Sequence, residues 1–216
     1  MLKLSRRLEA ILSELSGETC ADIGCDHGKL IVSALLTEKV KFGYAVDISK
    51  LSLEKAERLS REEKVASRLT LLYSDGATDL PQKVSVAVIA GMGATETVHI
   101  LSQGDFADKY VLSPHQDPQI LRSYLKDNDY FIEKDYIIFD KKYYPIIVAV
   151  KGDSNYTDEE MFFGKNKPET EDFFKFLSYR KKQLDRLNSL VKDKINPKTK
   201  AEKEEADRWC SKMSLI

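Results

Sequence analysis

A short segment with two glycines is the first feature of this sequence that points to ligand binding. It follows a run of apolar residues and reads Asp22-Ile23-Gly24-Cys25-Asp26-His27-Gly28. A strand that ends in a glycine loop and leads into a helix lets a ligand approach the backbone closely, because Gly24 has no Cβ. Ordinary turns in many α/β proteins look the same, so the segment alone leaves both interpretations open.

Acidic residues after the next two apolar runs indicate the kind of ligand. Asp47 lies roughly twenty residues beyond the loop, where a carboxylate can accept both ribose hydroxyls of an adenosyl group. A nicotinamide dehydrogenase would share this acid, but its first loop would read G-x-G-x-x-G. The loop here lacks the full set of diphosphate-binding glycines, so it favours a cofactor without a diphosphate, of which S-adenosylmethionine (SAM) is the obvious one. Asp75-Gly76 stands where methyltransferases commonly place an acid near adenine, although Asp75 could simply form a turn and Asp47 could support a helix cap at Ser49.

Alternating strand and helix patterns position these residues. Short apolar runs predict strands at 19–23, 42–46, 68–73, 84–90 and 109–112, and apolar residues three or four apart predict helices at 4–15, 30–36, 51–63, 96–101 and 117–125. Two longer β runs, 131–139 and 143–150, follow without a helix between them, so they should pair antiparallel. This order predicts an α/β fold, the doubly wound, Rossmann-like sheet of class I methyltransferases with one antiparallel strand.

The pattern changes after residue 150. Residues 152–168 are polar and are interpreted as a linker or docking loop. Apolar stripes at 169–195 and 200–213, separated by Asn196-Pro197, predict two helices that pack as an antiparallel hairpin. We therefore expect a SAM-binding methyltransferase domain at 1–152, followed at 153–216 by a linker and a coiled-coil-like helical hairpin.

Composition narrows the class of protein further. The hydrophobic content of 42% is ordinary for a protein with a buried core, and the net charge of -1 weakens any argument from bulk charge. No apolar run approaches the roughly 18 residues of a membrane span, and the N-terminus does not resemble a signal peptide, so we expect a cytoplasmic protein without membrane contact. Cys20, Cys25 and Cys210 lack C-x-x-C spacing, and the three histidines lack ligand spacing, so reduced thiols and no metal site are expected.

Four motifs resemble those of one enzyme family. They occur in the order Leu4-Ser5-Arg6-Arg7-Leu8, Ala21-Asp22-Ile23-Gly24-Cys25-Asp26-His27, Ala90-Gly91-Met92-Gly93 and Leu112-Ser113-Pro114. In this order the chain resembles the bacterial tRNA adenine-N1 methyltransferases that modify adenine 22, the TrmK family. The resemblance extends over nearly the whole chain and includes Met161-Phe162-Phe163-Gly164. It implies a class I methyltransferase domain with a C-terminal helical hairpin, SAM as the cofactor and tRNA as the partner.

The resemblance also assigns site residues. It implies cofactor contacts by Arg7, Asp22, Gly24, His27, Asp47, Ile48, Asp75, Gly76, Ala90, Gly91 and Met92, and it places Asp26 beside the transferred methyl group. The chain departs from the family pattern at Ala94, where the family has glycine, and at Ser113 and His115, where the family reads Leu-Gln-Pro-Asn. The second departure lies where the target base is expected.

The expected chemistry requires positioning more than proton transfer. Adenine N1 has an in-plane lone pair, so it can attack the methyl group without losing a proton, provided that the two are held in line and the base is extruded from any helix. We hypothesise two catalytic residues: Asp26, which would bond the adenine N6 amino group, and His115, which would stack on or bond the base. The alternatives are a helix cap for Asp26 and an exposed turn for His115; His27 could face the SAM carboxylate or be an ordinary loop residue, and His99 reads as an ordinary helix residue.

A local excess of positive charge suggests where RNA could bind. Residues 165–200 contain eleven Lys or Arg residues against five Asp or Glu residues, an excess of six positive charges. They could contact phosphates or form a solvated helix face. The alternatives to a tRNA methyltransferase are a SAM-dependent enzyme that acts on another RNA, a small molecule or a protein, and a SAM-binding RNA-binding protein without turnover.

Overall fold

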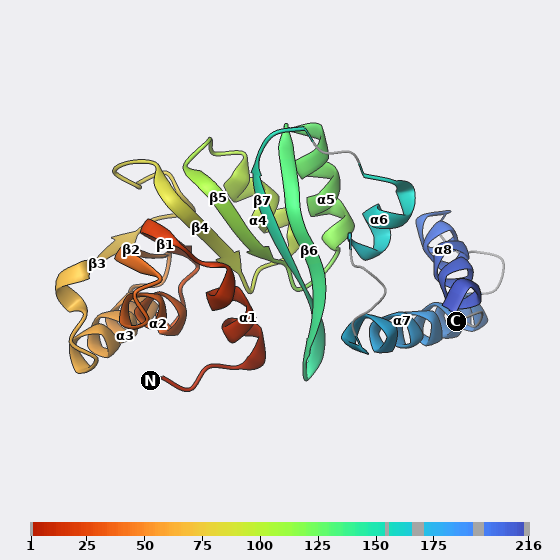
Figure 1. Cartoon of the computed structure of the whole chain (residues 1–216), viewed down its shortest axis with the longest axis horizontal. Helices are drawn as coiled ribbons and strands as arrows, with labels where there is room; N and C mark the ends of the chain where they lie inside the picture. Colours follow the sequence, from red (N-terminus) through yellow and green to blue (C-terminus); the bar gives the residue numbers. More distant parts are fainter. Residues whose placement is uncertain (1, 154–155, 166–170, 192–196, 214–216) are drawn as a thin grey trace. The chain divides into compact units, whose positions relative to one another are not determined.

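A seven-stranded mixed sheet forms the centre of the first unit of the chain, Met1–Asn155 (Figure 1). The computed structural model describes residues 2–153, 156–165, 171–191 and 197–213. The strands are β1 (Gly17–Ile23), β2 (Val40–Asp47), β3 (Leu69–Tyr73), β4 (Val84–Ala90), β5 (Ala107–Ser113), β6 (Tyr130–Asp140) and β7 (Lys142–Lys151). Their order is β3-β2-β1-β4-β5-β7-β6. Strands β1 to β5 are parallel, and β7 runs antiparallel to both β5 and β6, which confirms the predicted doubly wound sheet with one reversed strand.

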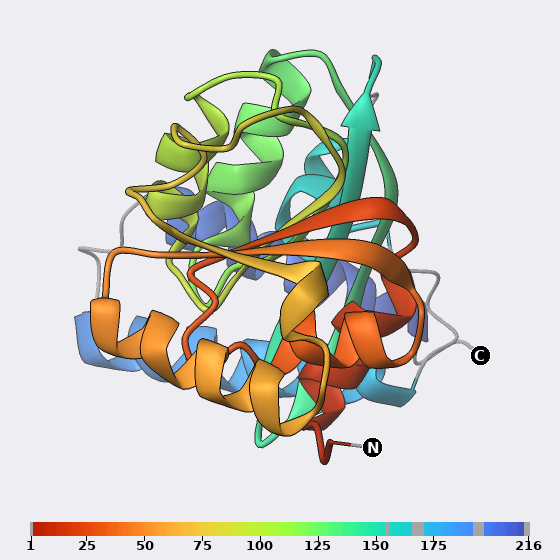
Figure 2. The same ribbon diagram turned by 90° about the vertical axis from the view of Figure 1, so that its left-hand side faces the viewer.

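Helices cover both faces of this sheet. They are α1 (Arg6–Glu14), α2 (Lys29–Leu36), α3 (Lys50–Glu62), α4 (Ala94–Leu101) and α5 (Pro118–Asp127). Figure 2 shows α1, α2 and α3 on one face, with α4 and α5 on the other. Because both faces are covered, the central strand β4 is a nearly continuous apolar run, and its residues from Val86 to Ile89 are fully buried.

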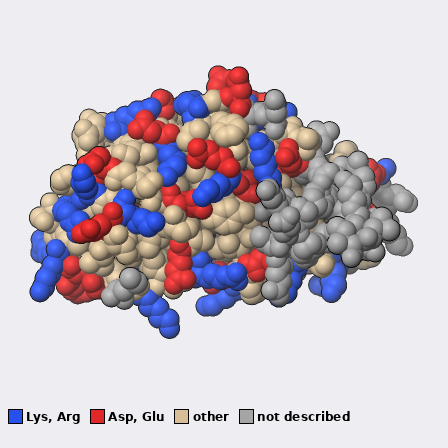
Figure 3. Space-filling view, in the orientation of Figure 1, with Lys and Arg blue, Asp and Glu red and all other residues tan. Residues whose placement is uncertain are grey.

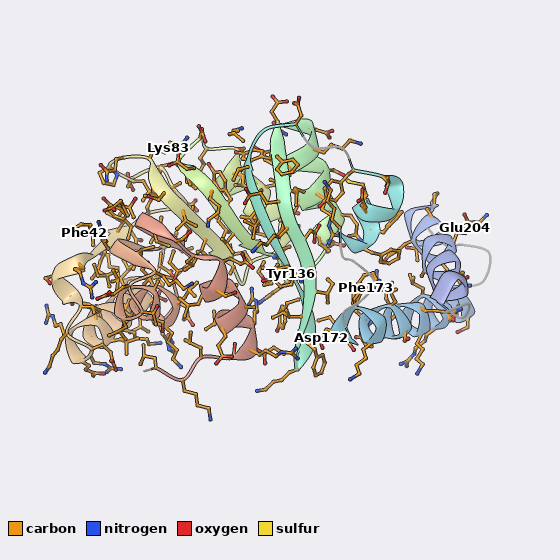
Figure 4. All side chains as sticks on the ribbon, viewed as in Figure 1. Phe42, Lys83, Tyr136, Asp172, Phe173 and Glu204 are labelled. Atoms are coloured by element: carbon orange, nitrogen blue, oxygen red, sulfur yellow. The ribbon has the colours of Figure 1, made fainter. Side chains whose placement is uncertain are left out.

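Local signals set the helix starts. Ser49 caps α3 as predicted, because its hydroxyl accepts a hydrogen bond from the backbone N–H of Ser52. Ser5 caps α1 in the same way. At the other end of α1, the Glu14 carboxylate accepts from the hydroxyl of Tyr136 at 3.0 Å and from Lys134 Nζ at 2.7 Å. Figure 4 labels Tyr136 on β6. These contacts hold the end of α1 against β6.

The carboxyl ends of five parallel strands meet at one edge of the sheet. Residues 23, 47, 73, 90 and 113 end β1 to β5 there, and β7 begins there because it runs in the opposite direction. Loops at this edge are the usual place for a ligand in an open α/β sheet. The four motifs between residues 4 and 114 that carry the family resemblance lie at or next to this edge.

The described residues of the second unit, Tyr156–Ile216, are mostly helical. It contains α6 (Asp158–Phe163), α7 (Glu171–Val191) and α8 (Pro197–Met213). Helix α6 lies inside the segment interpreted as a linker, so that interpretation was wrong for this stretch. Its start has a capping box, in which Thr157 and Glu160 each bond the other's backbone N–H.

Ion pairs join α7 to α8. Arg180 forms a two-pronged pair with Glu202, with Nη2 2.9 Å from Oε2, and Lys181 lies 3.0 Å from Asp207. Residues 192–196, which include the end of the first predicted helix and Asn196 of the predicted break at Asn196-Pro197, lie outside the described residues. Pro197 begins α8, a position that proline tolerates because the first helical N–H needs no partner within the helix.

Candidate active site

Two adjoining pockets open at the carboxyl edge of the sheet. The first pocket has a volume of about 640 Å³ and the second about 500 Å³. The first is lined by Ile23, Gly24, Asp47, Ile48, Ser74, Asp75, Gly76, Ala90, Gly91, Met92, Thr95, Glu96, His99 and Ile100. The second is lined by Ser5, Arg7, Leu8, Asp22, Gly24, Cys25, Asp26, His27, Lys29, Leu30, Ala90, Gly91 and His115. The two pockets share Gly24, Ala90 and Gly91. Each site residue predicted from the sequence lines one of the pockets or both.

The shared wall is made of backbone with little side chain. Gly24 and Gly91 have φ values of 74° and 96°, which favour glycine. A Cβ on Gly24 would collide with the methyl group of Met92, whereas a Cβ on Gly91 would have no heavy atom of the described residues within 4 Å. A ligand can therefore approach the backbone at Gly91 without obstruction.

Asp47 ties the first pocket to the glycine loop. Its Oδ2 accepts from the backbone N–H of Asp26 at 3.1 Å, and its Oδ1 accepts from that of Ser49 at 2.8 Å. A carboxylate has about four acceptor positions, so two remain for a pair of hydroxyls. Ile48, 65% exposed, adds an apolar surface at the wall of the same pocket.

Gln103, which the sequence analysis did not single out, holds the Asp75-Gly76 loop. Its Oε1 accepts from the backbone N–H of Ala77 at 2.7 Å, and its Nε2 donates to the carbonyl of Asp75 at 3.0 Å. A Cβ on Gly76 would collide with this side chain. Gly76 is thus required for the contact that shapes this wall.

Helix α4 adds a face that the sequence analysis did not assign to the site. His99, read as an ordinary helix residue, lines the first pocket together with Thr95, Glu96 and Ile100. Thr95 and Glu96 lie three to five positions before His99 and Ile100 on the helix that follows Ala90-Gly91-Met92-Gly93. That spacing puts them on one helix face, and it is the signal that could have identified them.

Asp22 is a buried acid at the wall of the second pocket. Burial is the main cause that raises its pKa to about 7, and the carboxylates of Asp47 and Asp26 raise it further. The neighbouring Cys25 is also buried, and burial raises the pKa of its thiol. A thiol of this kind is a poor nucleophile, so Cys25 is a wall residue of the pocket.

Asp26 points its carboxylate outward. Its side chain is 78% exposed, and its backbone has a φ of 49°. The N-cap of α2 is Gly28, and no side chain of the described residues caps that helix, so the interpretation of Asp26 as a helix cap was wrong. His27 lies beside it, with Nε2 3.4 Å from Asp26 Oδ1 and 3.0 Å from Lys55 Nζ.

Arg7 connects α1 to the end of β5. Its Nε donates to the Ser113 hydroxyl at 3.1 Å, its Nη2 donates to the Ser113 carbonyl at 2.8 Å, and its Nη1 lies 3.0 Å from Nε2 of His115. Its guanidinium carbon lies 4.6 Å from the ring centroid of Tyr144, a residue that the sequence analysis missed. The structure therefore brings Arg7 together with Ser113 and His115, two of the three positions that depart from the family pattern.

Two further properties concern metals and membranes. Among the residues that the structure describes, no group of three or more His, Cys, Asp or Glu side chains is placed to hold a metal ion. In the same part of the chain, no helix combines the length and apolar character that crossing a membrane requires. Cys20 and Cys25 are free and buried.

A sheet of this order, with a pocket where the first, second and fourth strands end, defines a class I methyltransferase architecture. Residues 4–147 match the family described as "Methyltransferase domain", and the chain belongs to this family.

Named relatives are similar over most of the chain. The "Putative tRNA methyltransferase MG248" of Mycoplasma genitalium is 32% identical over 137 residues, which cover 60% of this chain and 61% of that protein. The tRNA (adenine(22)-N(1))-methyltransferase of Bacillus subtilis is 30% identical over 159 residues, which cover 70% of this chain and 67% of that protein. The structure of M. capricolum TrmK in complex with S-adenosyl-homocysteine has the same fold, with a TM-score of 0.84 and 22% identity over 95% of this chain and 97% of that one.

Proposed function

We propose that this protein transfers a methyl group from SAM to N1 of an adenine in tRNA, at position 22. The observation that carries the proposal is the pair of adjoining pockets that meet at Gly24 and Gly91. One pocket has the features that an adenosyl group requires, and the other has polar side chains for a base. The names of the relatives from Bacillus subtilis and Mycoplasma genitalium support the choice of tRNA, and the former supports the position.

The first pocket fits SAM on this chain's own geometry. The oriented Asp47 carboxylate can accept from two ribose hydroxyls, and Ile48 offers an apolar face to a purine ring. The open backbone at Gly91 leaves room for the sulfonium end of the ligand. When bound, SAM supplies a methyl group on a positively charged sulfur.

Residues of the second pocket would hold the acceptor. As N1 bonds to the methyl carbon, the S–C bond breaks and positive charge develops on the adenine ring. Asp26 lies in the same pocket with an exposed carboxylate, which can accept a hydrogen bond from the N6 amino group and stabilise this charge. The reaction needs no general base, because N1 carries no proton.

Phosphate contacts by the second unit form a further part of the proposal. Within residues 165–200, Arg180 and Lys181 pair with acids of α8, so part of the positive excess is neutralised inside the unit. Some of the other basic residues lie at 166–170 and 192–196, outside the described residues. On the face of the sheet unit seen in Figure 3, basic and acidic side chains are interspersed.

Methyl transfer from labelled SAM to unmodified bulk bacterial tRNA tests the proposal. The product is mapped by arrest of reverse transcription, because a methyl group on N1 blocks base pairing. We expect an arrest at a single adenine near the D-loop. Labelled tRNA without an arrest would show that an atom other than N1 is methylated. SAM binding without any transfer would indicate another substrate or a non-catalytic SAM-binding protein.

A further inference from the structure

The contact between Arg7 and His115 defines which ring nitrogen of His115 carries the proton. Arg7 Nη1 lies 3.0 Å from His115 Nε2, and a guanidinium can only donate hydrogen bonds. Nε2 therefore accepts, and the proton of the neutral imidazole resides on Nδ1. His115 is left with one N–H group at the wall of the second pocket.

Arg7 is itself held rigidly. Ser113 receives two of its hydrogen bonds, through a hydroxyl and a carbonyl on a fully buried residue. The backbone N–H of Arg7 donates to Asp140 Oδ2 at 3.1 Å, and the Tyr144 ring lies beside the guanidinium. The guanidinium is thus fixed by the ends of two neighbouring strands, and it orients His115 with little freedom.

The surroundings also keep His115 uncharged. Arg7 approaches it from α1, and Lys142 and the Tyr144 ring approach it from β7; the ring centroids of His115 and Tyr144 are 5.6 Å apart. The backbone N–H of His115 donates to the Met92 carbonyl at 2.8 Å. Partial burial first, and then the two cationic side chains, lower the pKa of His115. A neutral ring with a defined tautomer can serve as a directional donor.

The chemistry of adenine decides what this donor can bind. N1 must keep its lone pair for the methyl group, so a donor that assists the reaction must bind elsewhere on the base. The edge that carries the N6 amino group also carries N7, an acceptor. Asp26 offers an acceptor in the same pocket, and His115 offers a donor, so together they match this edge. Guanine presents an acceptor, O6, in place of the amino group, and O6 would face the carboxylate of Asp26.

We propose that His115 donates its Nδ1–H to N7 of the target adenine and that Arg7 is the positioning residue that holds this tautomer. The proposal rests on the proposed function and deepens it, because it names the groups that select adenine. It also gives a role to a position at which this chain departs from its family pattern.

A tRNA in which the target adenosine is replaced by 7-deazaadenosine tests the contact, since this analogue has C–H in place of N7. We expect kcat/KM of the wild-type protein to be about tenfold lower on the analogue, because one hydrogen bond is lost and its donor is left unpaired. His115→Ala should lose about as much on the normal tRNA and nothing further on the analogue. His115→Asn keeps an N–H donor and should retain some dependence on N7.

Equal rates of the wild-type protein on both tRNAs would overturn the role of His115 and leave the proposed function intact. A dependence on N7 that is undiminished in His115→Ala would also overturn it. No transfer to either tRNA would overturn the proposed function, and this proposal with it.

Nitrogen-15 NMR of the imidazole rings tests the role of Arg7 without turnover. The chain has three histidines, so the rings can be assigned with single variants. We expect His115 to be the Nδ1–H tautomer in the wild-type protein, to become a mixture in Arg7→Met, and to be unchanged in the neighbouring control Arg6→Met. An Nε2–H tautomer in the wild-type protein would contradict the proposal.

Discussion

The backbone N–H of Asp26 donates a hydrogen bond to the carboxylate of Asp47, at 3.1 Å. The residue proposed to face the target base is therefore held in place by the residue proposed to bind the cofactor ribose. Because this contact uses the backbone of Asp26, its own carboxylate stays available to a ligand. Single substitutions can therefore distinguish the proposed role of Asp26 from that of Asp47.

Asp26→Asn should slow turnover and leave cofactor binding intact. Asparagine tolerates the positive φ of 49° at this position, so the loop and its bond to Asp47 persist. We expect kcat to fall at least about tenfold, because the negative charge that stabilises the methylated base is lost. Calorimetry should give an unchanged Kd for SAM; full turnover in this variant would contradict the role of Asp26.

Asp47→Asn should weaken binding of the cofactor. One of the two carboxylate oxygens becomes an amide that cannot accept from a hydroxyl or from the N–H of Ser49 or Asp26. We expect the Kd for SAM to rise roughly 10- to 100-fold, the usual range for unpaired groups in a binding site. Asp75→Asn, which changes another acid that lines the first pocket, is the matched variant. An unaltered Kd for SAM in Asp47→Asn would show that the ribose does not bind at Asp47.

Alanine at two glycines should separate folding from binding. In Gly28→Ala, φ is 68° and the new Cβ would lie 2.6 Å from the Cβ of Ala56, so we expect a loss of about 1–3 kcal/mol in the free energy of unfolding. In Gly91→Ala only the backbone strain applies, about 1 kcal/mol, but the methyl group projects into open space that both pockets border. Urea unfolding and SAM titration of both variants should show Gly28→Ala as the less stable and Gly91→Ala as the weaker binder.

Asp22 should make stability fall as the pH rises. Its pKa is raised to about 7 in the folded protein, above the ordinary value near 3.9 of an unfolded chain. Between about pH 4 and pH 7 the folded state therefore binds more protons than the unfolded state. The free energy of unfolding falls as the pH rises through this interval, and the destabilisation by Asp22 is largest above pH 7. Asp22→Asn should be more stable than the wild-type protein at pH 8, with a smaller difference at pH 5.5, as measured by urea unfolding without ligand. If Asp22→Asn were instead less stable than the wild-type protein at pH 8, a partner of Asp22 would have to stabilise its ionised carboxylate.

The buried ion pair between α5 and β6 should be essential to the fold. Arg122 and Asp135 are both fully buried and form two hydrogen bonds, of 2.7 and 3.0 Å. Asp135→Asn leaves the guanidinium without its counter-charge, and we expect a loss of about 3–5 kcal/mol in the free energy of unfolding. The exposed pair of Arg58 and Glu62 is the control, because Glu62→Gln should cost no more than about 0.5 kcal/mol. Similar losses in the two variants would contradict this account.

Much of the sheet and of the pocket wall followed from sequence patterns. The strand 84–90 matched β4 residue for residue, because a strand covered on both faces is apolar throughout. Asp47 and Asp75 reached one pocket because the carboxyl ends of parallel strands meet at one edge of the sheet. The capping box at Thr157 and Glu160 was present in the sequence, but a helix of six residues is too short to show a periodic apolar face.

Contacts between distant segments could not be predicted in this way. The contact of Arg7 with the cofactor stays a prediction, but no sequence pattern indicated that its guanidinium would contact Ser113 and His115, more than a hundred residues away. The hydrogen bonds of Gln103 to the loop at residues 75–77 likewise depend on where the chain runs after α4 ends at Leu101. Such pairs have no spacing rule, because tertiary packing alone brings them together.

The most direct test of the central claim uses two tRNA transcripts that differ only at position 22. One carries adenine there and the other carries guanine, and each is incubated with the protein and SAM before its nucleosides are analysed by mass spectrometry. The account predicts one 1-methyladenosine for each adenine-22 transcript and none in the guanine-22 transcript. Equal methylation of both transcripts, or a methylated nucleoside other than 1-methyladenosine, would contradict it.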